Sequence, residues 1–175
     1  MSLDAHEHRV AIALGASLGD TARTLRLALA ALAAMPGFTL SRASRVFVTP
    51  PDGGVAGATF RNAVVTGLWT GTPRDLLTRL RALETRLGRR PTRRWADRVL
   101  DLDVLLVGDL VCADGDFVVP HPRMRERPFV LVPLREVWPE AQDPRDGARF
   151  ADLPAARASL PVIGWATPTT HRSFP

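Results

Sequence analysis

The chain has 175 residues, 46% of them apolar, which is enough for one compact domain with a hydrophobic core and too short for two. Its net charge of +5 includes 23 basic residues that are all arginine, and the lack of lysine excludes the P-loop lysine, the strand lysine of protein kinases and Schiff-base chemistry. A single cysteine excludes an internal disulfide, and no uninterrupted apolar run reaches the roughly 18 residues of a membrane span, so we expect a cytoplasmic protein with no membrane partner.

The first half of the chain alternates strand-like and helix-like apolar patterns. In chain order, these predict a strand at 9–14, a helix at 21–35, strands at 39–48 and 60–69, and a helix at 73–87. Asp20 and Thr72 are good N-caps for the two helices, and Gly88 gives the second helix a C-terminal stop. The glycine-rich stretch at 52–59 has almost no large side chains and predicts an exposed loop.

The second half begins with an arginine-rich loop and is less regular. It predicts a loop at 89–98, a strand at 99–107, a hairpin turn at 108–109 into a strand at 110–112, a turn at 114–116, a helix at 129–137 and a short helix near Ala155. The order strand, helix, strand, strand, helix, strand predicts an α+β fold: a ferredoxin-like antiparallel sheet with helices on one face and a C-terminal extension. We expect a single domain at 9–165 with loose termini at 1–8 and 166–175.

Two aspartates mark the strand predicted at 99–107. Since successive side chains of a strand point to opposite faces, Asp101 and Asp103 share one face. The other face then carries the apolar side chains Leu100, Leu102, Val104 and Leu106. Two like charges side by side favour a cation between them, and Mg²⁺ takes carboxylate ligands and completes its shell with water and substrate phosphates. A solvated strand face is the alternative interpretation.

Basic residues flank this acidic pair in the sequence. They are Arg89, Arg90, Arg93, Arg94 and Arg98 before it, and His121, Arg123, Arg125 and Arg127 after it. Guanidinium groups match phosphate oxygens, and phosphoryl transfer depends mostly on positioning and charge neutralisation. The pattern therefore predicts a Mg²⁺-dependent enzyme that transfers a phosphoryl-type group from a nucleotide. Taken one at a time, the arginines are also typical of solvated surface charges.

Aromatic side chains near the ends of predicted elements suit a flat ligand. Trp95 lies among the arginines, and Phe60 and Phe129 stand at the starts of a predicted strand and helix. Aromatic rings can stack on a flat heterocycle, while the Asn62 amide can hydrogen-bond its edge. Ordinary core packing is the alternative for the two phenylalanines.

Several short segments match one known family in order and nearly in spacing. They are residues 13–20, 49–51, 60–63, 83–89, 94–95, 98–105, 119–127 and 129–133. Together, across roughly 9–140, the chain resembles the 6-hydroxymethyl-7,8-dihydropterin pyrophosphokinases of folate biosynthesis. The resemblance implies a ferredoxin-like fold and transfer of pyrophosphate from ATP to the hydroxymethyl group of the pterin, with release of AMP.

The resemblance also implies roles for individual residues. Asp101 and Asp103 would hold two Mg²⁺ ions, and the implied catalytic residues are these two with Arg94 and Arg98. The implied ATP-binding residues are Glu84, Arg98, His121 and Arg127. The implied pterin-binding residues are Thr49, Pro50, Phe60, Asn62, Trp95 and Phe129. ATP and the pterin are thus the expected partners of a monomeric enzyme that binds no nucleic acid.

Two loops depart from the family pattern. The family commonly has Gly-Ser-Asn-Leu where this chain has Ala16 and Ser17, so Ser17 must replace or shorten the hydrogen bond of the usual asparagine. The family also has Gly-Pro after its tryptophan, where this chain has Ala96 and Asp97. Asp97 adds an anion near the phosphate-binding residues and is expected to weaken phosphate attraction slightly.

Other functions fit parts of the pattern. An RNA-binding module is the main alternative, since ferredoxin-like sheets with arginines and aromatics bind RNA. The acidic pair argues against it, because carboxylates repel phosphate unless a metal is present. A nucleotidyltransferase would need its glycine turn close before the acidic pair, whereas Gly15 lies far from Asp101 in the chain. No dedicated general base is evident, and metal-held geometry is expected to suffice. A general base at His121 is the weaker alternative.

Overall fold

The computed structural model describes residues 7–50, 58–89 and 99–165. Its strands are β1 (His8–Ala16), β2 (Phe38–Ala43), β3 (Val46–Thr49), β4 (Phe60–Trp69), β5 (Asp101–Val107), β6 (Cys112–Asp114), β7 (Phe117–Val119) and β8 (Val162–Ile163). Its α-helices are α1 (Thr21–Ala33), α2 (Pro73–Arg86) and α3 (Pro128–Val137), joined by the 3-10 turns η1 (Met124–Glu126), η2 (Phe150–Asp152) and η3 (Pro154–Arg157). None of the described helices is long and apolar enough to cross a membrane.

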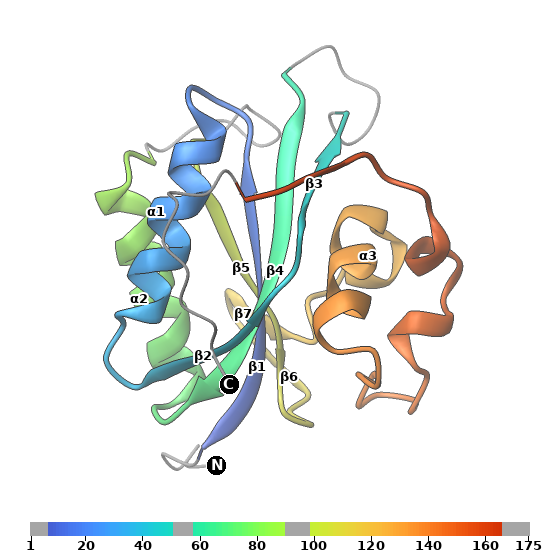
Figure 1. Cartoon of the computed structure of the whole chain (residues 1–175). Coiled ribbons are helices and arrows are strands. Elements are labelled where there is room, and N and C mark those ends of the chain that lie inside the picture. Colours follow the sequence, from blue (N-terminus) through green and yellow to red (C-terminus); the bar gives the residue numbers. More distant parts are fainter. Residues whose placement is uncertain (1–6, 51–57, 90–98, 166–175) are drawn as a thin grey trace.

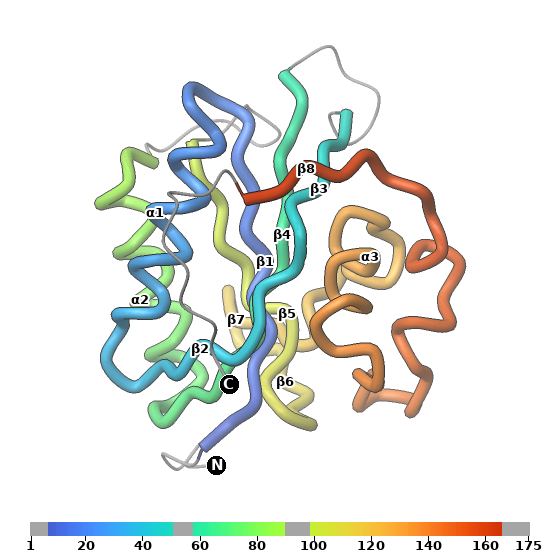
Figure 2. The backbone as a smooth tube through the Cα atoms, in the orientation of Figure 1, coloured from blue at the N-terminus to red at the C-terminus, as the bar shows by residue number. Residues whose placement is uncertain are grey.

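The main sheet is antiparallel, with the strand order β5-β1-β4-β3-β8 and with β2 also paired to β4 (Figure 1). The prediction of an α+β fold with an antiparallel sheet is confirmed. The strand expected at 39–48 is divided at Ser44, because the Ser44 side-chain oxygen accepts the N–H of Val64 and so interrupts the backbone ladder. The short strand β8, which the sequence did not predict, returns beside β3 (Figure 2).

Helices cover both faces of this sheet. In Figure 1, α1 and α2 lie on one face, and α3 lies with η2 and η3 on the other. Helices on one face were predicted, and α1 and α2 agree with that. The helix α3 belongs to the C-terminal part, and its buried residues Val130, Leu131 and Leu134 form a second core against β1, β4 and β5. The face that α3 partly covers is called the α3 face below.

The two helices on the first face begin and end where the sequence indicates. The Asp20 carboxylate accepts the N–H of Arg23 at the start of α1, and the Thr72 hydroxyl accepts the N–H of Asp75 at the start of α2. Gly88, just after α2, has φ = 98°, a conformation that favours glycine. The leucines buried against the sheet are Leu25 and Leu32 of α1 and Leu76, Leu80 and Leu83 of α2.

A β-bulge in β5 changes the face of its last residues. The register with β1 shifts where Ile12 pairs with Val104 and Ala11 pairs with Leu106, which leaves one extra residue in β5. Leu106 therefore packs in the α3 core rather than with Leu100, Leu102 and Val104, so its predicted face was wrong. Asp101 and Asp103 precede the bulge and keep the predicted alternation.

The hairpin that follows β5 is formed by β6 and β7, and not by β5 and β6 as predicted. The chain turns at Gly108 but β6 does not pair with β5; it pairs with β7 in a separate two-stranded sheet. Gly115, at φ = 58°, lies in the turn of that hairpin. The prediction of a hairpin at 108–109 was wrong because the local turn pattern does not say which strand follows. A short helix near Ala155 is confirmed as η3.

Candidate active site

Strand pairing brings separate predicted site residues to one face of the sheet. Asp101 pairs with Gly15 on β1, Gly15 pairs with Asn62 on β4, and Thr49 on β3 pairs with Phe60. Cross-strand partners point to the same face, and neighbours two apart on one strand do so too. The even-numbered neighbours Leu14 and Leu102 lie in the core under α1 and α2, so this row lies on the α3 face.

The acidic pair lies beside an ion-pair relay from α2. Arg89 Nη1 lies 2.9 Å from Asp101 Oδ1 and also pairs with Glu84, whose Oε1 accepts the N–H of Leu102 at 2.6 Å. Burial alone would lower the pKa of Arg89, but the charges of Asp101 and Glu84 outweigh it and raise that pKa. The Arg89 guanidinium therefore balances part of the negative charge beside Asp101, and the predicted Mg²⁺ between the two aspartates stays a prediction.

Glu84 is an almost fully buried member of this relay, with 4% of its side chain exposed. Burial raises the pKa of Glu84 to about 7, against the opposing effects of the Leu102 N–H and of Arg89. Its hydrogen bond satisfies a backbone group of β5, the edge strand of the described sheet, at the residue between Asp101 and Asp103. Glu84 therefore links α2 rigidly to the acidic pair.

The donor set at this point suits Mg²⁺. Asp101 and Asp103 are both partly exposed carboxylates on one strand face. Within the described residues, no group of three or more histidine, cysteine or acidic side chains forms a candidate metal site. Two carboxylates alone fit an ion that keeps water and substrate phosphates as its remaining ligands, and they do not fit a closed structural site.

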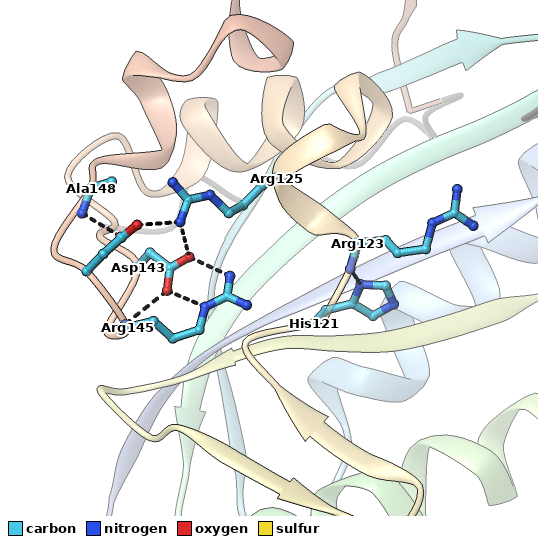
Figure 3. A network of polar contacts seen from close by, with 7 residues as sticks. His121, Arg123, Arg125, Asp143, Arg145 and Ala148 are labelled. Atoms are coloured by element: carbon cyan, nitrogen blue, oxygen red, sulfur yellow. Dashed lines mark hydrogen bonds and ion pairs between the residues drawn. The ribbon is translucent and has the colours of Figure 1, made fainter.

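His121 is fixed by two hydrogen bonds, of which Figure 3 shows the one from Arg123. Its N–H donates to the Leu105 carbonyl at 2.9 Å, and its ring Nδ1 accepts the N–H of Arg123 at 3.3 Å. Burial, with a contribution from Arg127, lowers the pKa of His121 to about 4. The ring is therefore neutral near pH 7, and because Nδ1 accepts the Arg123 N–H, Nε2 carries the proton and can donate a hydrogen bond.

The depressed pKa of His121 predicts a pH effect on stability. Its folded-state pKa of about 4 lies below the ordinary 6.5, so the unfolded chain binds the extra proton first as the pH falls. The neutral ring contributes fully to the free energy of unfolding above pH 6.5. This contribution is lost as the pH falls from 6.5 to about 4, by at most about 1.4 kcal/mol per pH unit.

Urea unfolding of the metal-free protein at pH 7 and pH 5 measures this effect. We expect wild type to lose more unfolding free energy between the two than His121→Gln, which keeps an amide donor but does not titrate. Equal losses in both proteins would show that His121 titrates normally.

Arg127 and Phe129 stand together at the start of α3. The Arg127 guanidinium carbon lies 5.4 Å from the centre of the Phe129 ring, a cation-π distance. Arg125 does not join them: its guanidinium points away from His121 and pairs with Asp143 and Asp146 (Figure 3). The flanking arginines of the sequence thus do not act as one phosphate-facing group.

Asn62 and Thr49 form a buried polar pair on the same face. Asn62 Nδ2 donates to Thr49 Oγ1 at 2.8 Å, and both residues are almost fully buried. Gly15 lies next to them, and a Cβ at Gly15 would stand 3.3 Å from Asn62 Oδ1. The missing side chain therefore leaves the amide oxygen of Asn62 open. Phe60, beside Thr49, is partly exposed and Pro50 is exposed.

The structure adds Gly15 to the site and gives a definite contact to Arg89, one of the flanking arginines without an assigned role. Gly15 is placed by strand pairing and Arg89 by its ion pair with Asp101. Other predicted residues fall outside the described part of the chain: Arg94, Trp95 and Arg98, with the family departures Ala96 and Asp97. Ser17, at the other departure, is buried.

Comparison with known proteins gives one consistent family. A family model described as 7,8-dihydro-6-hydroxymethylpterin-pyrophosphokinase (HPPK) matches residues 11–139. A 2-amino-4-hydroxy-6-hydroxymethyldihydropteridine pyrophosphokinase of Synechocystis sp. is 36% identical over 152 residues, covering 83% of this chain and 74% of that protein. A protein of the same name from Methylorubrum extorquens is 41% identical over 132 residues, covering 75% of this chain and 84% of that protein.

Solved structures agree on the fold. The crystal structure of Plasmodium falciparum HPPK-DHPS A437G with SDX-DHP matches with a TM-score of 0.70 at 12% identity, covering 87% of this chain and 46% of that one. At this identity the likeness shows the fold alone, and the chain spans less than half the length of that solved protein. None of the relatives and structures described here supports the RNA-binding alternative.

Proposed function

The chain belongs to the 7,8-dihydro-6-hydroxymethylpterin-pyrophosphokinase family, and on this premise we propose that it transfers a pyrophosphoryl group from ATP to the hydroxymethyl group of 6-hydroxymethyl-7,8-dihydropterin. AMP is the second product, and the reaction serves folate synthesis. The enzyme is a cytoplasmic monomer with ATP and the pterin as partners and without a nucleic-acid partner. Size-exclusion chromatography with light scattering tests the monomer.

One observation carries the proposal: the pairing register sets Asp101, Gly15 and Asn62 in a row across three strands. This row supports a site in which phosphates bind at Asp101 and the heterocycle binds at Asn62, two strands away on the α3 face. A hydroxymethyl group attached to a ring held at Asn62 reaches toward phosphates held at Asp101, as group transfer between two small molecules requires.

Asp101 and Asp103 are the residues that hold two Mg²⁺ ions in this proposal. These ions neutralise charge on the triphosphate when bound. Arg89 contacts Asp101 in this structure, so its guanidinium lies beside the position proposed for the metal-bound phosphates. Arg94 and Arg98 complete the catalytic set. Glu84 holds Arg89 by an ion pair and β5 by its hydrogen bond from the Leu102 N–H.

The transfer step needs little covalent help from the protein. The hydroxymethyl oxygen attacks the β-phosphorus, the bond from that phosphorus to the oxygen shared with the α-phosphate breaks, and AMP leaves with that oxygen. The hydroxyl proton passes to solvent water late in a loose transition state, so no strong base is required. His121, neutral and protonated at Nε2, donates a hydrogen bond to phosphate beside Arg127.

The pterin is held by its edge and by its faces. Its amide-like edge meets the open Oδ1 of Asn62, next to Gly15. Phe60 and Phe129 flank the ring, Thr49 fixes the Asn62 amide, and Pro50 and Trp95 complete the pocket.

A direct assay tests this proposal. Purified protein with ATP, Mg²⁺ and reduced hydroxymethylpterin is expected to release AMP, and leaving out the pterin abolishes the release. EDTA in excess stops the reaction and added Mg²⁺ restores it, because the acidic pair alone cannot bind the triphosphate. No AMP in the complete mixture, or equal AMP with and without the pterin, contradicts the proposed function.

A further inference from the structure

A buried carboxylate outside the site is surrounded by two arginines (Figure 3). The Asp143 side chain is 0% exposed. Its Oδ1 accepts the backbone N–H of Arg145 at 3.0 Å and Arg145 Nε at 2.8 Å. Its Oδ2 accepts Arg145 Nη2 at 2.6 Å and Arg125 Nη1 at 3.2 Å. We call Arg125, Asp143, Arg145 and Asp146 the Asp143 clasp.

The two arms of the clasp have different reach. Arg145 is two residues from Asp143, so its contacts fold a local loop, which the bond from Gly147 N–H to the Asp143 carbonyl also closes. Arg125 lies 18 residues earlier and comes from the turn η1. Arg125 Nη1 also contacts Asp146 Oδ2 at 2.6 Å. Of the two arms, this is the one that joins the 143–148 loop to another element.

The turn that Arg125 anchors carries two residues of the proposed ATP site. His121 and Arg127 flank η1, and the Arg127 N–H donates to the Met124 carbonyl within it. Met124 is fully buried in the α3 core, so the turn is held by packing on one side and by the clasp on the other. The Arg125 side chain points away from His121 in Figure 3, toward Asp143 and Asp146.

Burial of a carboxylate costs free energy unless well-placed partners pair with it. The Arg145 contacts already close the 143–148 loop, so the loop itself does not need the contact from Arg125. We propose that Asp143 is a positioning residue for ATP binding: through Arg125 it fixes the turn from which His121 and Arg127 reach the triphosphate. This inference rests on the proposed function. It makes the loop after α3 part of the ATP-binding machinery, acting through Arg125 on His121 and Arg127.

Positioning and simple electrostatics predict opposite signs for one variant. Asp143→Asn removes a negative charge and weakens the Arg125 arm, which keeps its contact with Asp146, so electrostatics alone predicts tighter ATP binding. Positioning predicts weaker binding, with the KM for ATP raised about tenfold or more and the KM for the pterin unchanged within about twofold. Arg125→Gln is expected to raise the KM for ATP similarly, and the double variant by less than the product of the single effects.

Two further variants separate positioning from loop stability. Arg145→Gln breaks the local arm and is expected to lower the melting temperature with a smaller change in the KM for ATP. Asp116→Asn, which removes an exposed partner of Arg74 and Arg81 in the β6–β7 hairpin, leaves both KM values unchanged. An unchanged or lower KM for ATP in Asp143→Asn, or parallel changes in both KM values that follow the melting temperature, overturns the inference.

A substrate-free measurement keeps this result distinct from the proposed function. Hydrogen exchange at the Arg127 amide is expected to be faster in Arg125→Gln than in wild type, and unchanged in Asp116→Asn. If wild type releases no AMP, the proposed function fails, while exchange at Arg127 still decides whether the clasp holds the turn. If the Arg127 amide of Arg125→Gln exchanges at the wild-type rate, the Asp143 clasp does not hold the turn. This test remains decisive even if Asp143→Asn does not fold.

Discussion

Asp101→Asn and Asp103→Asn each lower kcat for AMP release by about a thousandfold or more. Asparagine keeps the shape of aspartate but not its charge, so Mg²⁺ would lose a charged ligand, and with it several kcal/mol of transition-state stabilisation. The two variants differ in their surroundings, because Asp101→Asn also leaves Arg89 with Glu84 as its remaining partner in the relay, whereas Asp103→Asn keeps the Arg89–Asp101 contact. Equal losses in both would show that the metal, and not the relay, dominates.

Steady-state AMP release at saturating ATP, pterin and Mg²⁺ measures this effect. Asp109→Asn is the matched control, since Asp109 follows the same strand but is exposed in the turn after it. The control is expected to keep the wild-type rate. A wild-type rate in either variant of the acidic pair would contradict a metal site on this strand face.

Asn62→Ala lowers kcat/KM for the pterin by about a hundredfold, while the KM for ATP stays near the wild-type value. The buried amide is held by Thr49 with its oxygen open toward Gly15, so in the proposed complex its loss leaves the edge of the pterin without its hydrogen-bond partner. An effect on the pterin alone separates the two ends of the site.

Thr66→Ala is the matched control for this prediction. Thr66 lies on the same strand and face as Asn62 and is also buried, but its hydroxyl has no hydrogen-bond partner among the described residues. We expect no change in the kinetics of Thr66→Ala. A shared rise of both KM values in Asn62→Ala would instead indicate a general loss of structure.

Much of the fold follows from local patterns. Asp20, Thr72 and Gly88 set the helix ends, and leucines at helical spacing set the buried faces, because these signals act within a few residues. The β5 bulge and the partner of β6 were missed, since each depends on the pairing of a strand and not on its own residues. Ser44 likewise divides its strand through a bond to Val64 on a neighbouring strand.

The site shows the same division. Alternation alone placed Asp101 and Asp103 on one face, and the structure agrees. The sequence could not show that Gly15 stands between Asp101 and Asn62, because that depends on two strand registers. Arginines also look alike in a sequence: Arg89 turns toward the acidic pair, whereas Arg125 is bound to the loop after α3. Roles assigned to Arg94, Trp95 and Arg98 stay predictions.

The fate of the two terminal phosphates of ATP decides most directly whether the chain is a pyrophosphokinase. Phosphorus NMR of the complete reaction follows every phosphate at once. We expect AMP and a pterin carrying two linked phosphates to form in equal amounts, with both phosphates derived from the β and γ positions of ATP. Formation of ADP with a pterin monophosphate, or of ADP with free phosphate, would contradict pyrophosphoryl transfer at this site.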